Sequence, residues 1–337
     1  MYRVRPARHD DVPGIERLLS QMEARVSTLP EDRDRLAEKI ELSQRAFERD
    51  PLVAGRERLL FVLEETESGD ILGTSGIDRS AGNGTPFYNY RCDELIHSSH
   101  QLDVNNTVPV LYMTHELTGR SLLCSLTFDK NRVDQAGREL LSRARFLYMH
   151  LNADRFDPRV IVEIQGVQTP DGQSPFWDSL GRHFFGMDFR EADYYSHVKS
   201  KTFIAELMPA HPIYVTLLSE YAQEVIGQPH PAAEANCQLL HREGFRIGKY
   251  IDIFDGGPTL EAELAQINTV KRAKLKQVKR APHTMGLNYL VGVARENSFV
   301  ATLAKLTDGM GDVLRVPETC ADTLNVSDGD DVVLSPL

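Results

Sequence analysis

The chain has 337 residues, of which 41% are hydrophobic and 26% charged, and it carries a formal net charge of −11 at pH 7. This length is enough for one large domain or two ordinary ones, and the composition is that of a soluble globular protein. The acidic charge argues against a nucleic-acid partner, because phosphate contacts need a positive surface.

The cysteines and the apolar runs narrow the class of protein further. Cys92, Cys124, Cys237 and Cys320 are scattered without a Cys-x-x-Cys pair, so the sequence indicates neither a zinc site nor a disulfide framework. No metal is therefore expected. No apolar run approaches the length of a transmembrane helix, and the N-terminus lacks a signal-peptide core. These features predict a cytoplasmic protein that does not bind membranes.

The first part of the chain predicts a strand, two helices and a hairpin. Asp10 and Asp11 are typical helix caps, and Pro13 is tolerated in a first turn. Apolar residues then recur at helical spacing, and later alternate in two runs separated by a turn. The predicted elements are a strand at 1–7, helices at 10–19 and 36–47, and strands at 59–64 and 71–77.

A strand that enters a helix through a short polar turn follows. The apolar run 122–128 leads into a turn with Arg132, Gln135 and Gly137, and a helix is predicted over 138–147. Free backbone N–H groups and the positive end of the helix dipole make such a turn a seat for pyrophosphate. The element resembles the Arg/Gln-x-x-Gly-x-Gly/Ala signature of acyl-CoA-dependent N-acyltransferases, with Gln135 at the place of the first glycine.

The order of the elements resembles the GNAT acetyltransferase fold. Helix-then-strand closing elements are predicted twice, at 176–184 and 235–245, but the pyrophosphate turn occurs once. We therefore predict an α/β (α+β) chain with a tandem GNAT-like fold whose second half is degenerate. A single large α/β domain stays an alternative. Further strands are predicted at 108–113, 160–164 and 201–207, and a helix at 175–181.

The character of the sequence changes near residue 262. The run 270–280 is strongly basic and predicts a solvated linker or surface strand; a site for CoA phosphates or for an acidic subunit is the alternative. Strands at 289–294, 299–304 and 325–334 predict a small β-rich appendage. The predicted domains are a GNAT-like acyl-CoA-binding domain at 1–197, a partial second half at 198–265, and the linker with the appendage at 266–337.

Longer motifs resemble the arginine N-succinyltransferase family. They are Ser-Pro-Phe-Trp at 174–177, Phe-Ile-Ala-Glu-Leu-Met-Pro at 203–209, His-Pro-Ile-Tyr at 211–214, Gly-Gln-Pro-His-Pro at 227–231 and the run through Asp-Gly-Gly-Pro-Thr at 250–260. The resemblance implies transfer of succinyl from succinyl-CoA to the α-amine of L-arginine in a ternary complex, the first step of arginine catabolism by the succinyltransferase route. Some members also use ornithine. It further implies a homo-oligomer, or a heteromer with a paralogous subunit.

The resemblance also implies roles for individual residues. His230 lies at the family's proton-donating histidine, and histidine titrates near neutral pH. Leu126 lies at the family's succinyl-CoA contact, and we expect Arg132, Gln135 and Gly137 to hold the coenzyme. Without the resemblance, a histidine between two prolines is more often a residue of a rigid loop with no catalytic role.

Recognition of arginine requires carboxylates for its guanidinium group. Asp255 is the preferred candidate, with Asp252, Glu206 and Glu163 as others. Hydrogen-bonded turn carboxylates are the structural alternative. The succinyl carboxylate needs a cation or N–H donors, and the sequence does not rank its candidates Arg91, His115 and Arg120. Cys124 receives no nucleophilic role, because direct transfer is usual for this fold.

Three functions remain open at this stage: an active succinyltransferase, a non-catalytic partner subunit, and an acyl-CoA-binding sensor. Gln135 keeps the partner subunit open, because a side chain at this place crowds a pyrophosphate. His230 argues for the enzyme.

Overall fold

The computed structural model describes residues 1–21, 28–30, 32–198, 202–295, 297–309 and 311–337. It divides into two compact units that interleave along the chain. Unit 1 contains Met1–Asn83, Ser121–Pro158 and Glu263–Leu337, and unit 2 contains Gly84–Arg120 and Arg159–Ala262. The division into domains at 1–197, 198–265 and 266–337 stays a prediction.

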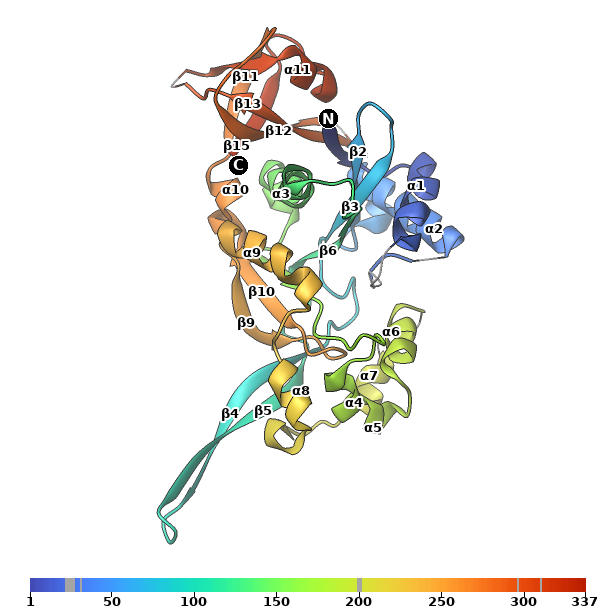
Figure 1. Cartoon of the computed structure of the whole chain (residues 1–337), viewed down its shortest axis with the longest axis vertical. Helices are drawn as coiled ribbons and strands as arrows, with labels where there is room; N and C mark the ends of the chain where they lie inside the picture. Colours follow the sequence, from blue (N-terminus) through green and yellow to red (C-terminus); the bar gives the residue numbers. More distant parts are fainter. Residues whose placement is uncertain (22–27, 31, 199–201, 296, 310) are drawn as a thin grey trace. The chain divides into compact units, whose positions relative to one another are not determined.

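Unit 1 is built on one sheet with the strand order β14-β11-β15-β12-β13-β1-β2-β3-β6 (Figure 1). Neighbouring strands are antiparallel, except that β11 and β14 are parallel. The strands are β1 Tyr2–Pro6, β2 Arg58–Glu65, β3 Ile71–Asp78, β6 Ser121–Phe128, β11 Lys274–Ala281, β12 Leu287–Arg295, β13 Ser298–Leu306, β14 Val313–Pro317 and β15 Asp331–Pro336.

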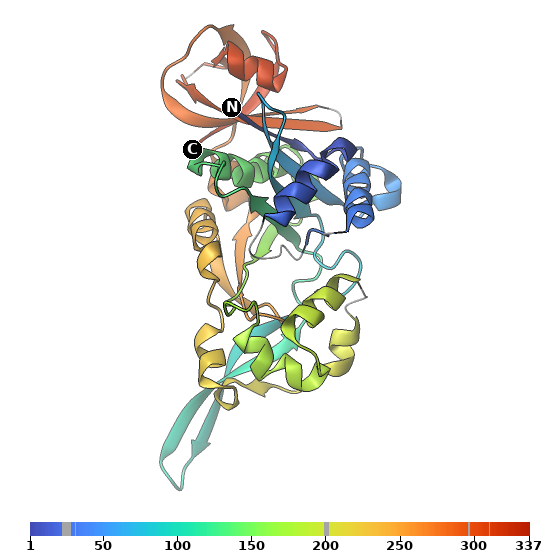
Figure 2. The ribbon, with the colours of Figure 1, turned by 45° about the vertical axis from the view of Figure 1, so that its right-hand side comes forward.

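Helices cover both faces of this sheet around β2. The helices of unit 1 are α1 Val12–Ser20, α2 Arg33–Phe47, α3 Gln135–Leu151, α10 Asn268–Lys271 and α11 Glu318–Leu324. Leu60 and Val62 of β2 belong to the same apolar cluster as α1 and α2, which lie side by side in Figure 2. Phe61 points the other way and contacts Tyr148 of α3, with ring centroids 5.4 Å apart. The predicted alternation therefore explains this layering.

The C-terminal β region joins the sheet through β13, which pairs with β1. Its own core contains apolar residues of β11–β15 and α11. The basic run ends α10 and then, from Lys274, forms β11, so the strand alternative holds and the linker does not. Two of its cations have acidic partners: Lys274 lies 2.6 Å from Asp308, and Lys279 lies 2.6 Å from Asp328. These pairs favour a structural role for the run over a CoA phosphate site.

Unit 2 has its strands in the order β7-β10-β9-β4-β5-β8. Its strands are β4 Asn89–Ser99, β5 Val104–Thr114, β7 Arg159–Glu163, β8 Ile213–Tyr214, β9 Arg246–Ile251 and β10 Pro258–Glu263. Its helices are α4 Pro175–Ser179, α5 Gly181–Phe185, α6 Phe189–Val198, α7 Thr202–Leu207, α8 Glu220–Val225 and α9 Glu234–Glu243. Trp177, Phe176 and Tyr90 are central to its apolar core.

Strands β4 and β5 form a long hairpin that projects from unit 2 (Figure 1). The register is regular from Asn89↔Thr114 to Ser99↔Val104. Among the described residues, further pairing is confined to its proximal part: β4 pairs with β9 at Tyr90 and Arg91, and β5 pairs with β8.

Several sequence predictions are wrong. The segment 201–207 was expected to be a strand, but the described residues from Thr202 form helix α7; Lys201 lies outside the described residues. The segment 176–184 was expected to end in a strand, but Gly181 begins helix α5. Elements that were not predicted include β4, β8, β14, α6, α8, α10 and α11. The other predicted elements are present, with boundaries shifted by a few residues.

Candidate functional site

Strand β6 of unit 1 contains a bulge immediately before Leu126. Ser125 has a φ of +53°, which L-residues other than Asn and Asp rarely adopt, and the register with β3 shifts between Thr74 and Gly76. Thr74 Oγ1 donates to Ser125 O at 2.8 Å, and Ser125 N donates to Thr28 Oγ1 at 3.0 Å. The bulge therefore turns the backbone away from regular pairing, a feature common beside functional sites. Leu126 itself is half-buried.

The turn between β6 and α3 is capped by its own carboxylate. Asp134 is the N-cap of α3, and its Oδ1 accepts the Gly137 N–H at 2.8 Å. Gly137 is required by packing, because a Cβ there would lie 2.8 Å from Val133 and 3.1 Å from Tyr2. A carboxylate at this position stabilises the helix but repels a phosphate. A pyrophosphate on this turn would therefore need the Asp134 side chain to rotate away.

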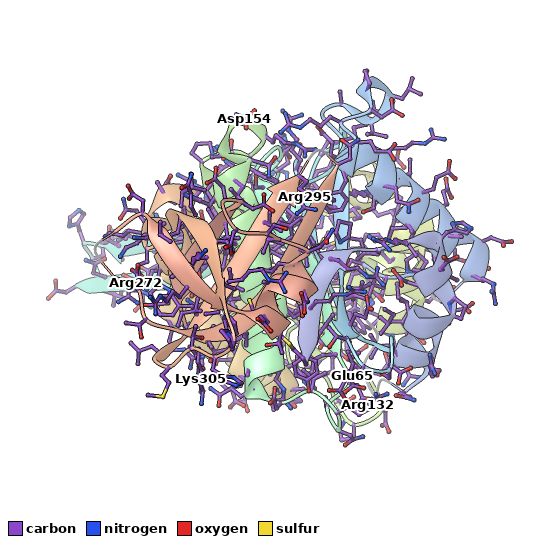
Figure 3. All side chains as sticks on the ribbon, turned by 90° about the horizontal axis from the view of Figure 1, so that it is seen from above. Glu65, Arg132, Asp154, Arg272, Arg295 and Lys305 are labelled. Carbon is purple, nitrogen blue, oxygen red and sulfur yellow. The ribbon has the colours of Figure 1, made fainter. Side chains whose placement is uncertain are left out.

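The exposed side chains of the turn have local partners. Arg132 forms ion pairs with Asp70 and Glu65, each at 2.8 Å, and Figure 3 shows Arg132 and Glu65 next to each other. Gln135 Nε2 donates to Glu139 at 3.2 Å. The structure thus brings Leu126, Arg132, Gln135 and Gly137 together on one β6–α3 unit. Their role in holding a coenzyme stays a prediction.

His230 of unit 2 begins a short 3₁₀ turn, Pro231–Ala233, and is half-buried. The ring Nδ1 accepts the Ala232 N–H at 3.1 Å, and the backbone N–H of His230 donates to Gln165 O at 2.7 Å. Because Nδ1 is the acceptor, the proton of the neutral ring is on Nε2. The backbone therefore orients the ring, and within the described part of the chain the structure gives its Nε2–H no partner.

Asp255 ties the loops around His230 together. Its Oδ2 accepts the Gly166 N–H at 2.8 Å, and its Oδ1 accepts the Gly257 N–H at 2.9 Å. Burial and the charge of Asp252 raise the pKa of Asp255 to about 8. Gly166 bridges to Pro229, directly before His230. Asp255 thus connects the segment after β7 with the turn before β10, next to the histidine loop.

The other three acidic candidates differ from Asp255 and from one another. Glu163, at the end of β7, accepts the Asn89 side-chain amide at 2.5 Å. Asp252 is half-buried, and its Oδ1 accepts the backbone N–H groups of Phe254 and Asp255 at 2.7 and 3.0 Å. Glu206 is exposed on α7. The structure therefore places Asp252, Asp255 and His230 on neighbouring loops of unit 2. It gives Glu206 no position in that cluster.

A polar cluster links β4, β5 and β9 in the same unit. Arg91 Nη1 donates to Glu116 Oε1 at 2.7 Å, and Tyr250 donates to Glu116 Oε2 at 2.6 Å. Burial, followed by the bond to Glu116, raises the pKa of Tyr250 to about 12. Arg91, a candidate for the succinyl carboxylate, is thus already ion-paired. His115 is exposed beside the Tyr88 ring.

Cys124 precedes the bulge and is not suited to nucleophilic attack. Burial, with a smaller contribution from Asp78, raises the pKa of its thiol to about 12. The thiol is therefore protonated at neutral pH, whereas nucleophilic cysteines react as thiolates.

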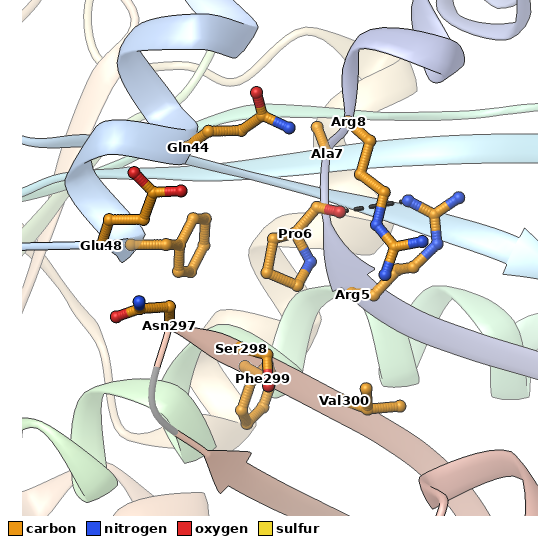
Figure 4. Close-up of a pocket in the computed structure, with 11 residues that line it drawn as sticks. Arg5, Pro6, Ala7, Arg8, Gln44, Glu48, Asn297, Ser298, Phe299 and Val300 are labelled. Carbon is orange, nitrogen blue, oxygen red and sulfur yellow. Dashed lines mark hydrogen bonds between the residues drawn. The ribbon is translucent and has the colours of Figure 1, made fainter.

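A cavity of about 140 Å³ lies in unit 1 between β1, the end of α2 and the start of β13 (Figure 4). Its lining includes Arg8, Glu48 and Asn297. It contains none of the residues that the sequence analysis proposed for the site.

Comparisons with known proteins identify the family. The model described as "Arginine N-succinyltransferase beta subunit" matches residues 2–269, and that of the corresponding C-terminal domain matches residues 271–336. The chain belongs to the arginine N-succinyltransferase family. The family resemblance stated from the sequence is thus confirmed, and the family is one of acyltransferases of arginine catabolism.

Individual relatives agree with this family. "Arginine N-succinyltransferase subunit alpha" of Pseudomonas aeruginosa is 40% identical over 336 residues, 99% of each chain. "Arginine N-succinyltransferase" of Escherichia coli O139:H28 is 38% identical over 336 residues, 99% of this chain and 97% of that one. The solved structure of arginine/ornithine succinyltransferase subunit AI from P. aeruginosa has a TM-score of 0.91 at 38% identity, with 100% of this chain and 98% of that chain covered. This likeness confirms the mixed α/β class and the C-terminal β region.

Two further findings concern metals and membranes. Among the described residues, no group of three or more His, Cys, Asp or Glu side chains is arranged to hold a metal ion. Across the same residues, no helix has the length and apolar character needed to cross a membrane.

Ser125 and Thr28 are structural features of this arginine N-succinyltransferase family member that the sequence analysis did not find. A serine in a strand-like run gives no sign of a positive φ, and Thr28 is 97 residues away from its partner. The only signal was indirect: Gly73 and Gly76 on β3 leave room beside the bulged strand, where a Cβ would lie 2.8 to 3.0 Å from the nearest atoms.

Proposed function

We propose that this chain transfers the succinyl group of succinyl-CoA to the α-amine of L-arginine, with ornithine as the alternative amine. The amine nitrogen attacks the thioester carbonyl carbon, a C–N bond forms, the C–S bond breaks, and CoA leaves as the thiol. The observation that carries this proposal is 38–40% identity to arginine N-succinyltransferases along nearly the whole chain. The bulged β6, followed by α3, is the element on which the coenzyme is proposed to bind.

For His230 we propose the role of donor to the negative charge that develops on the leaving sulfur. Nδ1 accepts the Ala232 N–H, which fixes the tautomer of the neutral ring and leaves Nε2–H as its donor. Full protonation of the ring would break the bond to Ala232. His230 therefore acts first as a hydrogen-bond donor, which stabilises the charge where it forms.

For the coenzyme, the β6–α3 turn fits succinyl-CoA on one condition. The first-turn N–H groups of α3 suit a pyrophosphate, but Asp134 competes for the Gly137 N–H. We propose that Asp134 turns outward when Leu126, Arg132, Gln135 and Gly137 hold the coenzyme.

For the arginine guanidinium we propose Asp255 or Asp252, with Glu206 as the third candidate. The two backbone N–H bonds of Asp255 use one lone pair on each oxygen. With a pKa of about 8 the side chain is largely protonated at neutral pH without substrate, so a guanidinium binds by displacing that proton. An Asp255→Asn variant with unchanged KM for arginine would remove this assignment.

The proposal for the fold is a tandem GNAT-like arrangement with a degenerate second half. Unit 1 supports it with the order β1-α1-α2-β2-β3-β6-α3, and α9 followed by Gly244 and β9 supports a partial second half. The helical state of 181–185 weakens the case for a closing strand in the first half.

A partner-subunit function is the second candidate, because the P. aeruginosa relative is named a subunit. The test is release of thiol from succinyl-CoA by the purified full chain, with arginine and with ornithine. Turnover by the chain alone supports an enzyme that needs no paralogous subunit. Turnover only after a paralogous chain is added supports a heteromer, and CoA binding without any turnover supports a sensor and contradicts the proposal.

A further inference from the structure

Helix α3 buries an arginine against the sheet of unit 1. Leu141 and Arg145 lie four residues apart and therefore share one face of the helix. Ser75 of β3 donates to Leu141 O at 3.1 Å, so this face lies against the sheet. Only 2% of Arg145 is exposed.

Arg145 has hydrogen bonds but no opposite charge. Nε donates to Ser142 O at 3.0 Å, and Nη2 donates to Ser142 Oγ at 2.9 Å. Within the described part of the chain, the structure gives it no ion pair and no bond from Nη1. Burial lowers the pKa of the guanidinium to about 10, which still leaves it charged at neutral pH. A buried charge without a counter-charge strongly destabilises the folded chain, so we expect this arginine to have a function that offsets the cost.

Other buried arginines of unit 1 are compensated. Arg5 is ion-paired with Asp11 at 2.7 Å. Arg155 donates at 2.7 Å to Ala46 O in the last turn of α2, where the helix dipole is negative. Arg145 lies in the middle of α3 and has neither kind of compensation; its guanidinium carbon lies 5.9 Å from the centroid of the Phe146 ring, which is a weaker interaction than an ion pair.

The position of Arg145 matches the acyl end of a bound coenzyme. The face of α3 that carries Leu141 and Arg145 lies against β3 at Ser75, and β3 pairs with β6 at the bulge. From Gln135 to Arg145, α3 rises about 15 Å. About a dozen bonds separate a CoA phosphate oxygen from the sulfur, which equals roughly four extended residues, or about 14 Å. A coenzyme with its pyrophosphate at the start of α3 would thus bring its thioester to the level of Arg145.

We propose that Arg145 binds the terminal carboxylate of the succinyl group and thereby selects dicarboxylic acyl-CoA thioesters over neutral ones. This inference rests on the proposed function. A guanidinium pairs with a carboxylate through two parallel N–H bonds, and at such a buried site solvent screens the pair only weakly.

The test compares succinyl-CoA with butyryl-CoA, in which a methyl group replaces the carboxylate. In Arg145→Met, kcat/KM for succinyl-CoA falls about 100-fold or more relative to butyryl-CoA, because a site built for a polar group discriminates strongly. Arg145→Lys keeps the charge and retains the preference, with a higher KM for succinyl-CoA. Without ligand, Arg145→Met melts at or above the temperature of the unmodified chain, because an uncompensated charge is removed.

Arg143→Met is the matched control, because Arg143 is buried on the same helix and bonded to Thr269 and Pro336. This variant loses stability and keeps the succinyl preference. If the unmodified chain has no activity with succinyl-CoA, either alone or with a paralogous chain, the proposed function fails. If it is active but Arg145→Met keeps the same succinyl-to-butyryl ratio, or Arg145→Lys loses the preference, the Arg145 inference alone is overturned. A large loss of folding in Arg145→Met also overturns it, because the arginine would then be structural.

Discussion

The backbone N–H of Ala232 donates to Nδ1 of His230 at 3.1 Å. The His230 side chain therefore caps a turn through Nδ1 and has its proposed chemical role at Nε2. This relationship separates the two roles experimentally. Asparagine also caps a turn through its side-chain oxygen but offers no imidazole.

His230→Asn is expected to lower kcat for succinyl transfer by roughly 10²- to 10⁴-fold, the usual contribution of a positioned donor or acid. The melting temperature should stay close to that of the unmodified chain, because the cap is retained. His230→Ala should lose both kcat and about 1 kcal/mol of stability. Steady-state kinetics with thermal melting check this; full activity in His230→Asn would refute the assigned role.

Asp134→Asn is expected to lower KM for succinyl-CoA about fivefold to tenfold, because it removes a negative charge from the proposed pyrophosphate seat. The asparagine still caps α3, so stability should change little. Asp32→Asn is the control, because Asp32 caps α2 in the same way by accepting the Arg35 N–H. An unchanged KM in Asp134→Asn would place the phosphates elsewhere.

Asp255 should make stability depend on pH. Its pKa is raised from 3.8 to about 8 in the folded chain, so the folded state binds the proton more tightly than the unfolded state does. The proton-linked stabilisation is complete below about pH 4 and is lost as the pH rises to about 8. The melting temperature of the unmodified chain, relative to Asp255→Asn, should therefore fall between pH 4 and 8 and level off above. Glu206→Gln, at an exposed site, serves as the control; a flat difference for Asp255→Asn contradicts the prediction.

Ser125 holds a left-handed conformation at a cost that glycine does not have. Ser125→Gly should therefore be more stable than Ser125→Ala by about 1 kcal/mol. Both variants lose the hydroxyl that bonds Thr28, so the comparison isolates the backbone. Chemical denaturation measures the difference, and equal stabilities would show that the bulge relaxes without strain.

Much of unit 1 follows from sequence periodicity. The spacing of Leu36 and Ile40 predicts α2, and the alternation around Phe61 predicts β2, because local pattern and burial agree there. In contrast, the outer half of β4–β5 is exposed on both faces, so Asp93, Glu94 and their neighbours show no apolar alternation. Apolar alternation predicts a strand only where one face of the strand packs against a core, and the outer hairpin has no such face.

Helix α7 and the site could not be predicted from the sequence for a different reason. Phe203 and Ile204 form a short apolar run, for which periodicity does not distinguish strand from helix. The β6–α3 turn could be predicted because a glycine and several polar residues follow an apolar strand. The partners of Asp134, the tautomer of His230 and the buried charge of Arg145 depend on contacts that only the folded chain brings together.

The pairing of β1 with β13 brings Arg3 opposite Thr302 and Val4 opposite Ala301. The first strand of the chain therefore has a free edge during translation until the ribosome has made about 300 residues. At 5–20 residues per second, that wait is roughly 15–60 s, during which the edge can pair wrongly or meet a chaperone. Expression of residues 1–269 alone would make this exposure permanent, although the first of the two matching family models ends at residue 269.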